Sequence, residues 1–150
     1  MIKPERNRPR GRDKTEPPMS QIPSSHLDLL TEKKAFANLA TVLRDGSPQV
    51  TPVWVDYMDG LVRVNTAKGR VKARTMHEGA PVAMSIMDPE NPYRYIQVRG
   101  RVTHVTENGA DDHINALAKK YLGKDTYPNR QPGEVRLLVE IEPVSTQTMG

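Results

Sequence analysis

The stretch that decides the fold is GSPQVTPVWVDYMDGLVRVNTAKGRVKARTM, residues 46–76. Apolar residues alternate with polar ones along it, and Asp-Gly pairs at Asp45-Gly46 and Asp59-Gly60 favour tight hairpin turns. Together with the apolar run FANLATVL just before it, the stretch predicts an antiparallel meander of three strands. The expected strands occupy residues 36–43, 48–57 and 61–66.

Two prolines, Pro48 and Pro52, interrupt the second of these strands. Proline has no amide donor, so the strand must lie at a sheet edge or bend near Pro52. Such a strand leaves backbone groups unpaired. We therefore interpret the strand beside Val53 and Trp54 as an edge that binds a ligand, or as a plain edge protected against aggregation. Trp54 would either stack on a cofactor or fill the core.

The rest of the chain adds three strands and three helices. Ser24 or Ser25 can cap a short first helix, and Gly100 marks a bend or bulge in the longest strand. The further strands are expected over 81–87, 95–105 and 134–143. The later helices are expected over 70–77 and 110–123. Six strands with few helices between them indicate a mainly β fold, a six-stranded antiparallel barrel.

Composition limits the function classes. A chain of 150 residues forms one domain, and the absence of cysteine excludes a disulfide framework, a cysteine-ligated zinc site and thiol catalysis. No apolar run is long enough to cross a membrane, and no signal-peptide core is present, so we expect a cytoplasmic protein. Of the net charge of +4, residues 1–18 carry 6 − 3 = +3. We expect a flexible basic arm over 1–22, either a solubilising tail or an anion-binding arm, and a barrel domain over 23–150.

Signatures of side-chain catalysis are absent from the sequence. The four histidines have no metal-ligand spacing, and there is no nucleophile elbow and no phosphate-binding P-loop. The segment NTAKGRVKART, residues 65–75, does carry a recognisable binding pattern. A strand ends at Thr66, the chain turns, and a helix begins near Arg70, so a hydroxyl, backbone amides and the cations Arg70 and Lys72 converge. This pattern is typical of a phosphate site; its alternative is a solvated basic turn.

Residues 46–76, followed by YIQVRGRV at 95–102, resemble the split β-barrel flavin-binding proteins of the pyridoxamine-phosphate-oxidase-like superfamily. More narrowly, they look like the actinobacterial branch that uses the deazaflavin coenzyme F420. The resemblance covers about residues 26–143. It departs at Thr75, where relatives often have asparagine, and the basic arm is not a family feature.

The resemblance implies a split barrel whose strand backbone at 49–54 lies against the tricyclic ring. It implies that the segment 65–72 holds the phosphate, and that residues 94–95 approach the cofactor, often across a dimer interface. The candidate cofactor-binding residues are Gln49, Val50, Thr51, Pro52, Val53, Trp54, Asn65, Thr66, Arg70, Val71, Lys72, Arg94 and Tyr95.

The leading hypothesis is an oxidoreductase that transfers a hydride between F420, or alternatively FMN, and a small organic acceptor. The protein would supply position and electrostatics, with no covalent side-chain step. We expect a homodimer with cofactor sites at its interface, because relatives are dimers and Leu138 adds apolar area beyond the needs of one barrel. A basic nucleic-acid-binding barrel is the alternative, since the sequence pI is about 9.4. Its seven aromatic residues are too few for a stacking platform and a core. A third possibility is a coenzyme carrier without turnover.

Overall fold

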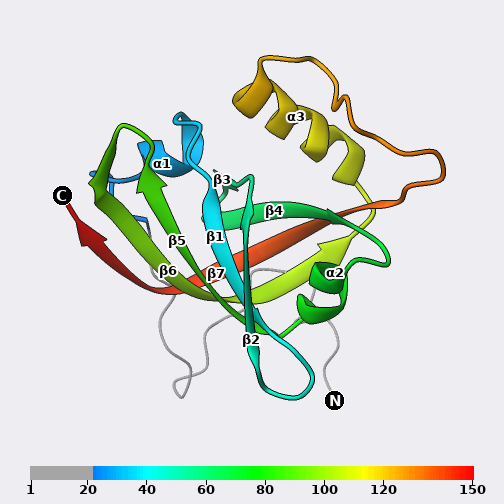
Figure 1. The fold of residues 1–150 in the computed structure, drawn as a ribbon, viewed down its shortest axis with the longest axis horizontal. Helices are drawn as coiled ribbons and strands as arrows, with labels where there is room; N and C mark the ends of the chain where they lie inside the picture. Colours follow the sequence, from blue (N-terminus) through cyan, green and yellow to red (C-terminus); the bar gives the residue numbers. More distant parts are fainter. Residues whose placement is uncertain (1–21) are drawn as a thin grey trace.

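A computed structural model describes residues 22–150 (Figure 1). The basic arm predicted over 1–22 lies outside the described residues except for Ile22, which is buried and belongs to the core. Within the described part, no helix is long and apolar enough to span a bilayer.

The described chain forms one antiparallel sheet, as the mainly β prediction required. The sheet order is β2-β1-β5-β6-β7-β4-β3, and neighbouring strands run antiparallel throughout. The seven strands are β1 (Ala37–Val42), β2 (Pro48–Val53), β3 (Asp56–Met58), β4 (Leu61–Ala67), β5 (Pro81–Asp88), β6 (Asn91–Thr106) and β7 (Arg136–Met149).

The predicted strand over 48–57 is wrong in one respect, because it is two strands at opposite edges of the sheet. Both Asp-Gly turns form hairpins, β1–β2 and β3–β4, but β2 does not pair with β4, so the three-stranded meander does not exist. The chain crosses between the edges at Trp54 and Val55. Side chains satisfy the Val55 backbone there: Tyr121 accepts its N–H at 3.1 Å and Lys120 donates to its carbonyl at 2.6 Å. The break raises the strand count from six to seven.

Two other strand boundaries differ from expectation. β6 begins at Asn91 rather than at residue 95, so only a tight turn separates it from β5, and β7 continues to Met149 rather than ending at residue 143. The bulge expected at Gly100 is confirmed, since the β6–β7 register shifts there. A Cβ at Gly100 would lie 2.6 Å from the Glu142 carbonyl oxygen, which is why glycine is required at this close approach.

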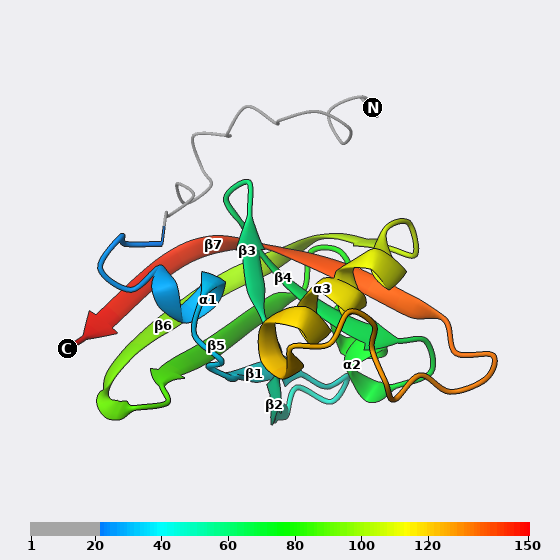
Figure 2. The same ribbon diagram turned by 90° about the horizontal axis from the view of Figure 1, so that it is seen from above.

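Three helices accompany the sheet: α1 (Asp28–Thr31), α2 (Val71–Thr75) and α3 (Ala110–Leu122). The N-cap of α1 is Leu27, with no side-chain cap; the predicted cap Ser25 instead hydrogen-bonds the His26 ring at 2.8 Å. Gly123 ends α3 in the left-handed conformation with φ 71°, the usual geometry after a helix end. Both α2 and α3 lie at one end of the curved sheet, and the C-terminus lies at the other (Figures 1 and 2).

The core has two parts. The larger fills the barrel interior, and a smaller cluster forms where Ile114, Leu117 and Tyr121 of α3 pack with Trp54 and Tyr127. Leu138 is 8% exposed and alternates away from the barrel-core residues of β7, on the strand that α3 contacts. It is therefore covered within its own chain, and the apolar surplus inferred from Leu138 does not exist.

Candidate functional site

A cavity of about 230 Å³ opens where the ends of β2 and β4 meet α2, α3 and the start of β7. This is below the roughly 300–1,000 Å³ of pockets that enclose a drug-sized ligand, so it fits part of a flavin-sized molecule. One side of the wall is mainly apolar and aromatic: Phe36, Pro52, Val53, Trp54, Ile114, Leu117 and Tyr127. The other side is polar: Asn65, Thr66, Arg70, Lys72, Asn129 and Arg136.

The aromatic side is held rigidly around Trp54. The Trp54 ring stacks on Tyr121, with centroids 5.2 Å apart and planes 5° from parallel, and meets Tyr127 edge-on at 6.0 Å. The Tyr121 hydroxyl donates to the Ala35 carbonyl at 2.6 Å, and burial raises the pKa of Tyr121 to about 12. One face of Trp54 is thus covered by its own chain while the residue still lines the cavity.

Lys120 holds the crossing segment at Trp54 and Val55 in place. Its ammonium donates to the carbonyls of Leu30 and Val55, both at 2.6 Å. Burial lowers the pKa of Lys120 to about 8, although the charge of Asp56 opposes the shift. From the sequence, Lys120 had only the appearance of a cation in the last turn of a helix. In the structure it ties α1, α3 and the chain crossing together, which keeps Trp54 in the cavity wall.

The polar side of the cavity carries unsatisfied groups. The Lys72 ammonium donates to the Thr51 hydroxyl at 3.0 Å. Burial, helped by the charge of Arg70, lowers the pKa of Lys72. The Thr66 hydroxyl is buried and, within residues 22–150, has no hydrogen-bond partner. Because α2 has only five residues, any attraction for an anion here would come from these side chains and not from a helix dipole.

Arg136 is the basic residue of the cavity that the sequence analysis missed. It is 4% exposed, donates to Asn65 Oδ1 and to Glu134 Oε2, both at 2.8 Å, and its guanidinium carbon lies 5.2 Å from the Tyr127 ring centroid. A signal was present, since alternation in the last strand sets Arg136 and Leu138 on the face opposite Val139. An arginine inside so apolar a strand needs buried partners.

Glu134 lies between two cations of the cavity. Its carboxylate contacts Arg136 at 2.8 Å and Arg70 at 3.6 Å. Burial acts to raise the pKa of Glu134, but the Gln131 amide and the Arg136 and Arg70 charges outweigh burial and lower it below its ordinary value. The carboxylate is therefore ionised at neutral pH.

Asn65 connects the cavity to a buried polar chain. Its amide nitrogen donates to the Ala110 carbonyl at 2.9 Å and to His113 Nδ1 at 3.0 Å. With Nδ1 accepting, His113 Nε2 carries the hydrogen and donates to Asp56 at 3.1 Å. Arg63 completes the chain with two bonds to Asp56, at 2.9 and 2.8 Å. Burial acts to raise the pKa of Asp56, but its bonds to His113 and Arg63 lower it to about 2. Among the described residues, no group of side chains could hold a metal ion.

The structure brings together seven of the thirteen predicted residues as cavity lining: Pro52, Val53, Trp54, Asn65, Thr66, Arg70 and Lys72. Thr51 joins them through its bond to Lys72. Gln49, Val50 and Val71 belong to β2 and α2 but do not line the cavity; Val50 is 63% exposed.

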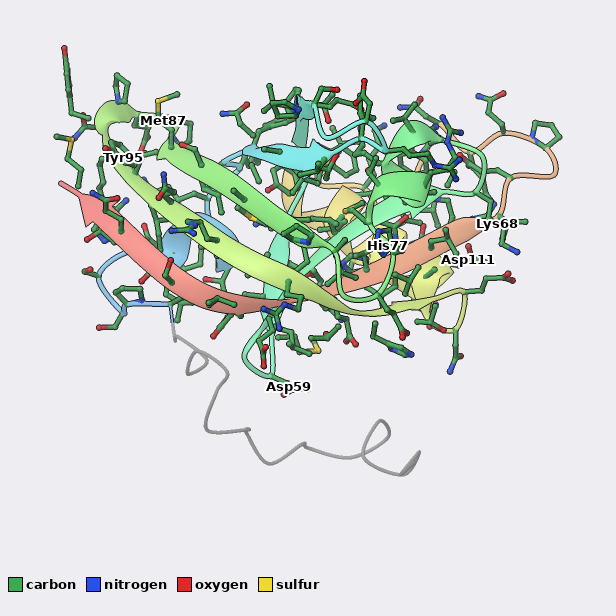
Figure 3. The ribbon with its side chains drawn as sticks, turned by 90° about the horizontal axis from the view of Figure 1, so that it is seen from below. Asp59, Lys68, His77, Met87, Tyr95 and Asp111 are labelled. Atoms are coloured by element: carbon green, nitrogen blue, oxygen red, sulfur yellow. The ribbon has the colours of Figure 1, made fainter. Side chains whose placement is uncertain are left out.

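Arg94 and Tyr95 lie elsewhere. Figure 3 shows Tyr95 at the opposite end of the sheet from Lys68, which follows β4. Arg94 donates to Asp28 at 2.6 Å, to Asp88 at 2.8 Å and to the Ser25 carbonyl at 2.8 Å. Within one chain neither residue reaches the cavity.

Comparisons with known proteins agree on the fold. A sequence model of the family described as pyridoxamine 5′-phosphate oxidase matches residues 24–149. A comparison with curated proteins finds no match. Among solved structures, the chain is similar to an F420 reductase, with 29% identity over 84% of this chain and 98% of the other, at a TM-score of 0.70.

Two more distant structures share the fold alone. One is the FAD and heme binding protein from Mycobacterium smegmatis, with 18% identity over 87% of this chain and 73% of that one, at a TM-score of 0.60. The other is HupZ of Group A Streptococcus, with 17% identity over 85% of this chain and 94% of that one, at a TM-score of 0.61.

Proposed function

Because the chain belongs to the pyridoxamine 5′-phosphate oxidase family, we propose that it is an oxidoreductase that moves a hydride between coenzyme F420 and a small organic acceptor. FMN is the alternative cofactor. The similarity to an F420 reductase supports F420 first, since it extends over 84% of this chain. Both cofactors carry a phosphate group, and the polar side of the cavity is the proposed binding site for that group.

The observation that carries this proposal is the unpartnered Thr66 hydroxyl beside Lys72. A buried hydroxyl without a partner is destabilising unless a ligand satisfies it. The Lys72 ammonium has three donor hydrogens, of which one bonds Thr51. A phosphate oxygen at this wall would accept from Thr66, Lys72 and Arg70 together, as charge-assisted hydrogen bonds. The residues present therefore fit a phosphorylated cofactor.

When bound, the cofactor supplies the hydride chemistry. The chain's own contribution is to bind and orient it. β2 ends the sheet order, so its outer edge has no strand neighbour among residues 22–150, and the segment Gln49–Trp54 is proposed to meet the ring with free backbone groups. Trp54, Ile114 and Leu117 exclude water from that side of the cavity.

We also propose a homodimer in which Arg94 and Tyr95 of the partner subunit complete each site. The cavity encloses only part of a flavin-sized ligand, which leaves room for a second subunit. Val42 and Val50, on the adjacent strands β1 and β2, are 44% and 63% exposed and offer apolar contact area. Light scattering at micromolar concentration with cofactor present would give twice the chain mass; a monomer mass would contradict the dimer.

The basic arm predicted over 1–22 is proposed to contact the glutamate tail of F420. Deleting residues 1–20 should then weaken F420 binding at low salt and leave FMN binding unchanged, because exposed charges are screened beyond about 8–10 Å at physiological salt. A nucleic-acid role is disfavoured, since Phe36, Trp54, Tyr121 and Tyr127 pack on one another rather than forming an open stacking surface.

The direct test is a pair of titrations of the purified full chain, one with F420 and one with FMN, followed by fluorescence quenching. We expect saturable binding of both rings, tighter for F420. Reduced cofactor is then offered a panel of enones, quinones and imines, and its reoxidation is followed by absorbance. Binding of neither cofactor would remove the proposal.

A further inference from the structure

One carboxylate sits inside the cavity's set of cations. Glu134 comes just before β7, its side chain is 7% exposed, and its Oε1 accepts the Gln131 amide at 3.3 Å. Its Oε2 bonds Arg136 at 2.8 Å, and it also lies 3.6 Å from Arg70. A buried carboxylate pointed at two cavity-lining cations competes directly with any anion that enters.

The two contacts of Glu134 are unequal. Arg136 is buried, with 3% of its side chain exposed, and it also bonds Asn65, so the Glu134–Arg136 pair is a fixed part of the wall. Arg70 is 53% exposed and 3.6 Å away, a loose contact that an incoming phosphate can replace. Glu134 therefore stays in place, still charged, when the cavity fills.

We propose that Glu134 is the specificity-determining residue that sets which phosphate charge the cavity accepts. The inference rests on the proposed function. Coulomb repulsion is proportional to ligand charge, so Glu134 opposes a dianionic phosphomonoester about twice as strongly as a monoanionic diester. F420 carries its phosphate as a diester, with one negative charge. FMN carries a monoester, with about −1.5 to −2 at pH 7. Glu134 thus shifts the preference of the cavity from FMN towards F420.

The test compares Glu134→Gln with the unmodified chain on three ligands that share one ring: riboflavin, riboflavin 4′,5′-cyclic phosphate and FMN. Removing the carboxylate should leave the dissociation constant of riboflavin unchanged. It should tighten binding of the cyclic diester by about three-fold and of FMN by about ten-fold, the square of the first factor. If only the deazaflavin ring binds, its phosphate-free form, its monoester and F420 replace the three.

The matched control is Glu107→Gln. Glu107 also pairs with a basic residue near the cavity, Lys68, at 2.5 Å, but both side chains are more than half exposed. Glu107→Gln should change none of the three dissociation constants, because solvent screens an exposed charge.

A second variant protects the test from a folding defect. Glu134→Asp keeps the charge but moves it away from Arg70. FMN binding should therefore tighten by less than in Glu134→Gln, and still by more than binding of the cyclic diester. Thermal melts of each variant show that it is folded. Equal changes for riboflavin and FMN, or no change in a folded Glu134→Gln, would overturn the inference. If the unmodified chain binds no member of either series, the proposed function fails instead.

Discussion

The two ends of the sheet differ in how fully they partner the cations that the sequence offered as cofactor-binding residues. At the C-terminal end, Arg94 donates to two carboxylates and a carbonyl. At the cavity end, within the described part of the chain, the side chain of Lys72 has one neutral partner and that of Arg70 has a single loose contact to a carboxylate. The sequence offered Arg94, Arg70 and Lys72 alike as cofactor-binding residues.

The difference shows how a structural cation can be told from a binding one. The hydrogen bonds that Arg94 donates to Asp28 and Asp88 raise the pKa of Arg94, and they tie α1 to the β5–β6 turn. Burial lowers the pKa of Lys72, so its charged form is disfavoured in the free chain. The proposed site is therefore argued from hydrogen-bond donors that the described residues leave without a partner, and not from the number of basic residues.

Lys72→Ala is expected to have the largest effect on binding. It removes a charge-assisted contact to the phosphate and should weaken cofactor binding by roughly 1.5–3 kcal/mol, about ten-fold to a hundred-fold. The thermal midpoint of the free chain should hardly move, because only the bond to Thr51 is lost. Arg70→Ala should act similarly, and Lys119→Ala, whose partner is the exposed Asp125, should do nothing. Unchanged dissociation constants for both site variants would mean that the phosphate lies elsewhere.

Arg94→Met is the reverse experiment. It leaves Asp28 and Asp88 without their shared cation and should lower the thermal midpoint of the cofactor-free chain. A loss of cofactor affinity in addition would indicate that Arg94 of the partner subunit reaches the site. If Arg94→Met kept the stability of the unmodified chain but bound cofactor more weakly, Arg94 would be a binding residue and the distinction between the two ends of the sheet would be wrong.

Asp56 offers a second fully partnered group, and its stability contribution depends on pH. The pKa of Asp56 is about 2 in the folded chain, below its ordinary value of 3.8. The unfolded chain therefore binds the proton first as pH falls, and stability is lost between about pH 4 and pH 2. The loss is about 2 kcal/mol, since one unit corresponds to about 1.4 kcal/mol. Urea unfolding at several pH values measures it.

Asp56→Asn should flatten that part of the pH profile, while Asp125→Asn, at an exposed pair, should leave it as in the unmodified chain. Because Asp56 holds His113, and His113 holds Asn65, a profile identical in Asp56→Asn and the unmodified chain would show that the polar chain behind the cavity does not stabilise the fold.

Local sequence signals predicted the two hairpins, but contacts between distant parts of the chain left no such signal. Each Asp-Gly turn formed because its residues need only their neighbours: Asp59 has φ 55° and Gly60 φ 80°, which few other residue pairs accept. The split of the 48–57 strand depends on Tyr121 and Lys120, more than sixty residues away, which satisfy Val55. No pattern near Val55 shows that its partners lie on a distant helix.

The same limit applies to the site. Thr66, Arg70 and Lys72 are close in sequence, so their convergence was visible as a segment. Arg136 and Tyr127 reach the cavity from a different part of the chain. The sheet order sets β7, which carries Arg136, beside β4, and Tyr127 lies between α3 and β7, where its amide donates to Asn115 of α3. The placement of Arg94 and Tyr95 near a cofactor came from the family resemblance and stays a prediction.

Thr66→Val is the smallest and sharpest change, because it separates binding from stability at one atom. Valine keeps the shape of threonine but removes the buried hydroxyl that has no partner within residues 22–150. Stability of the free chain should therefore stay the same or rise, since no hydrogen bond is lost and an unsatisfied polar group is removed. Binding of FMN or F420 should weaken by about 0.5–1.5 kcal/mol, roughly two-fold to twelve-fold, the usual net contribution of one hydrogen bond. Riboflavin, without a phosphate, should bind as before. Thermal melts and titrations on the same preparations measure both quantities. A destabilised variant would show that the hydroxyl is satisfied within the protein, and unchanged FMN binding would place the phosphate away from this wall.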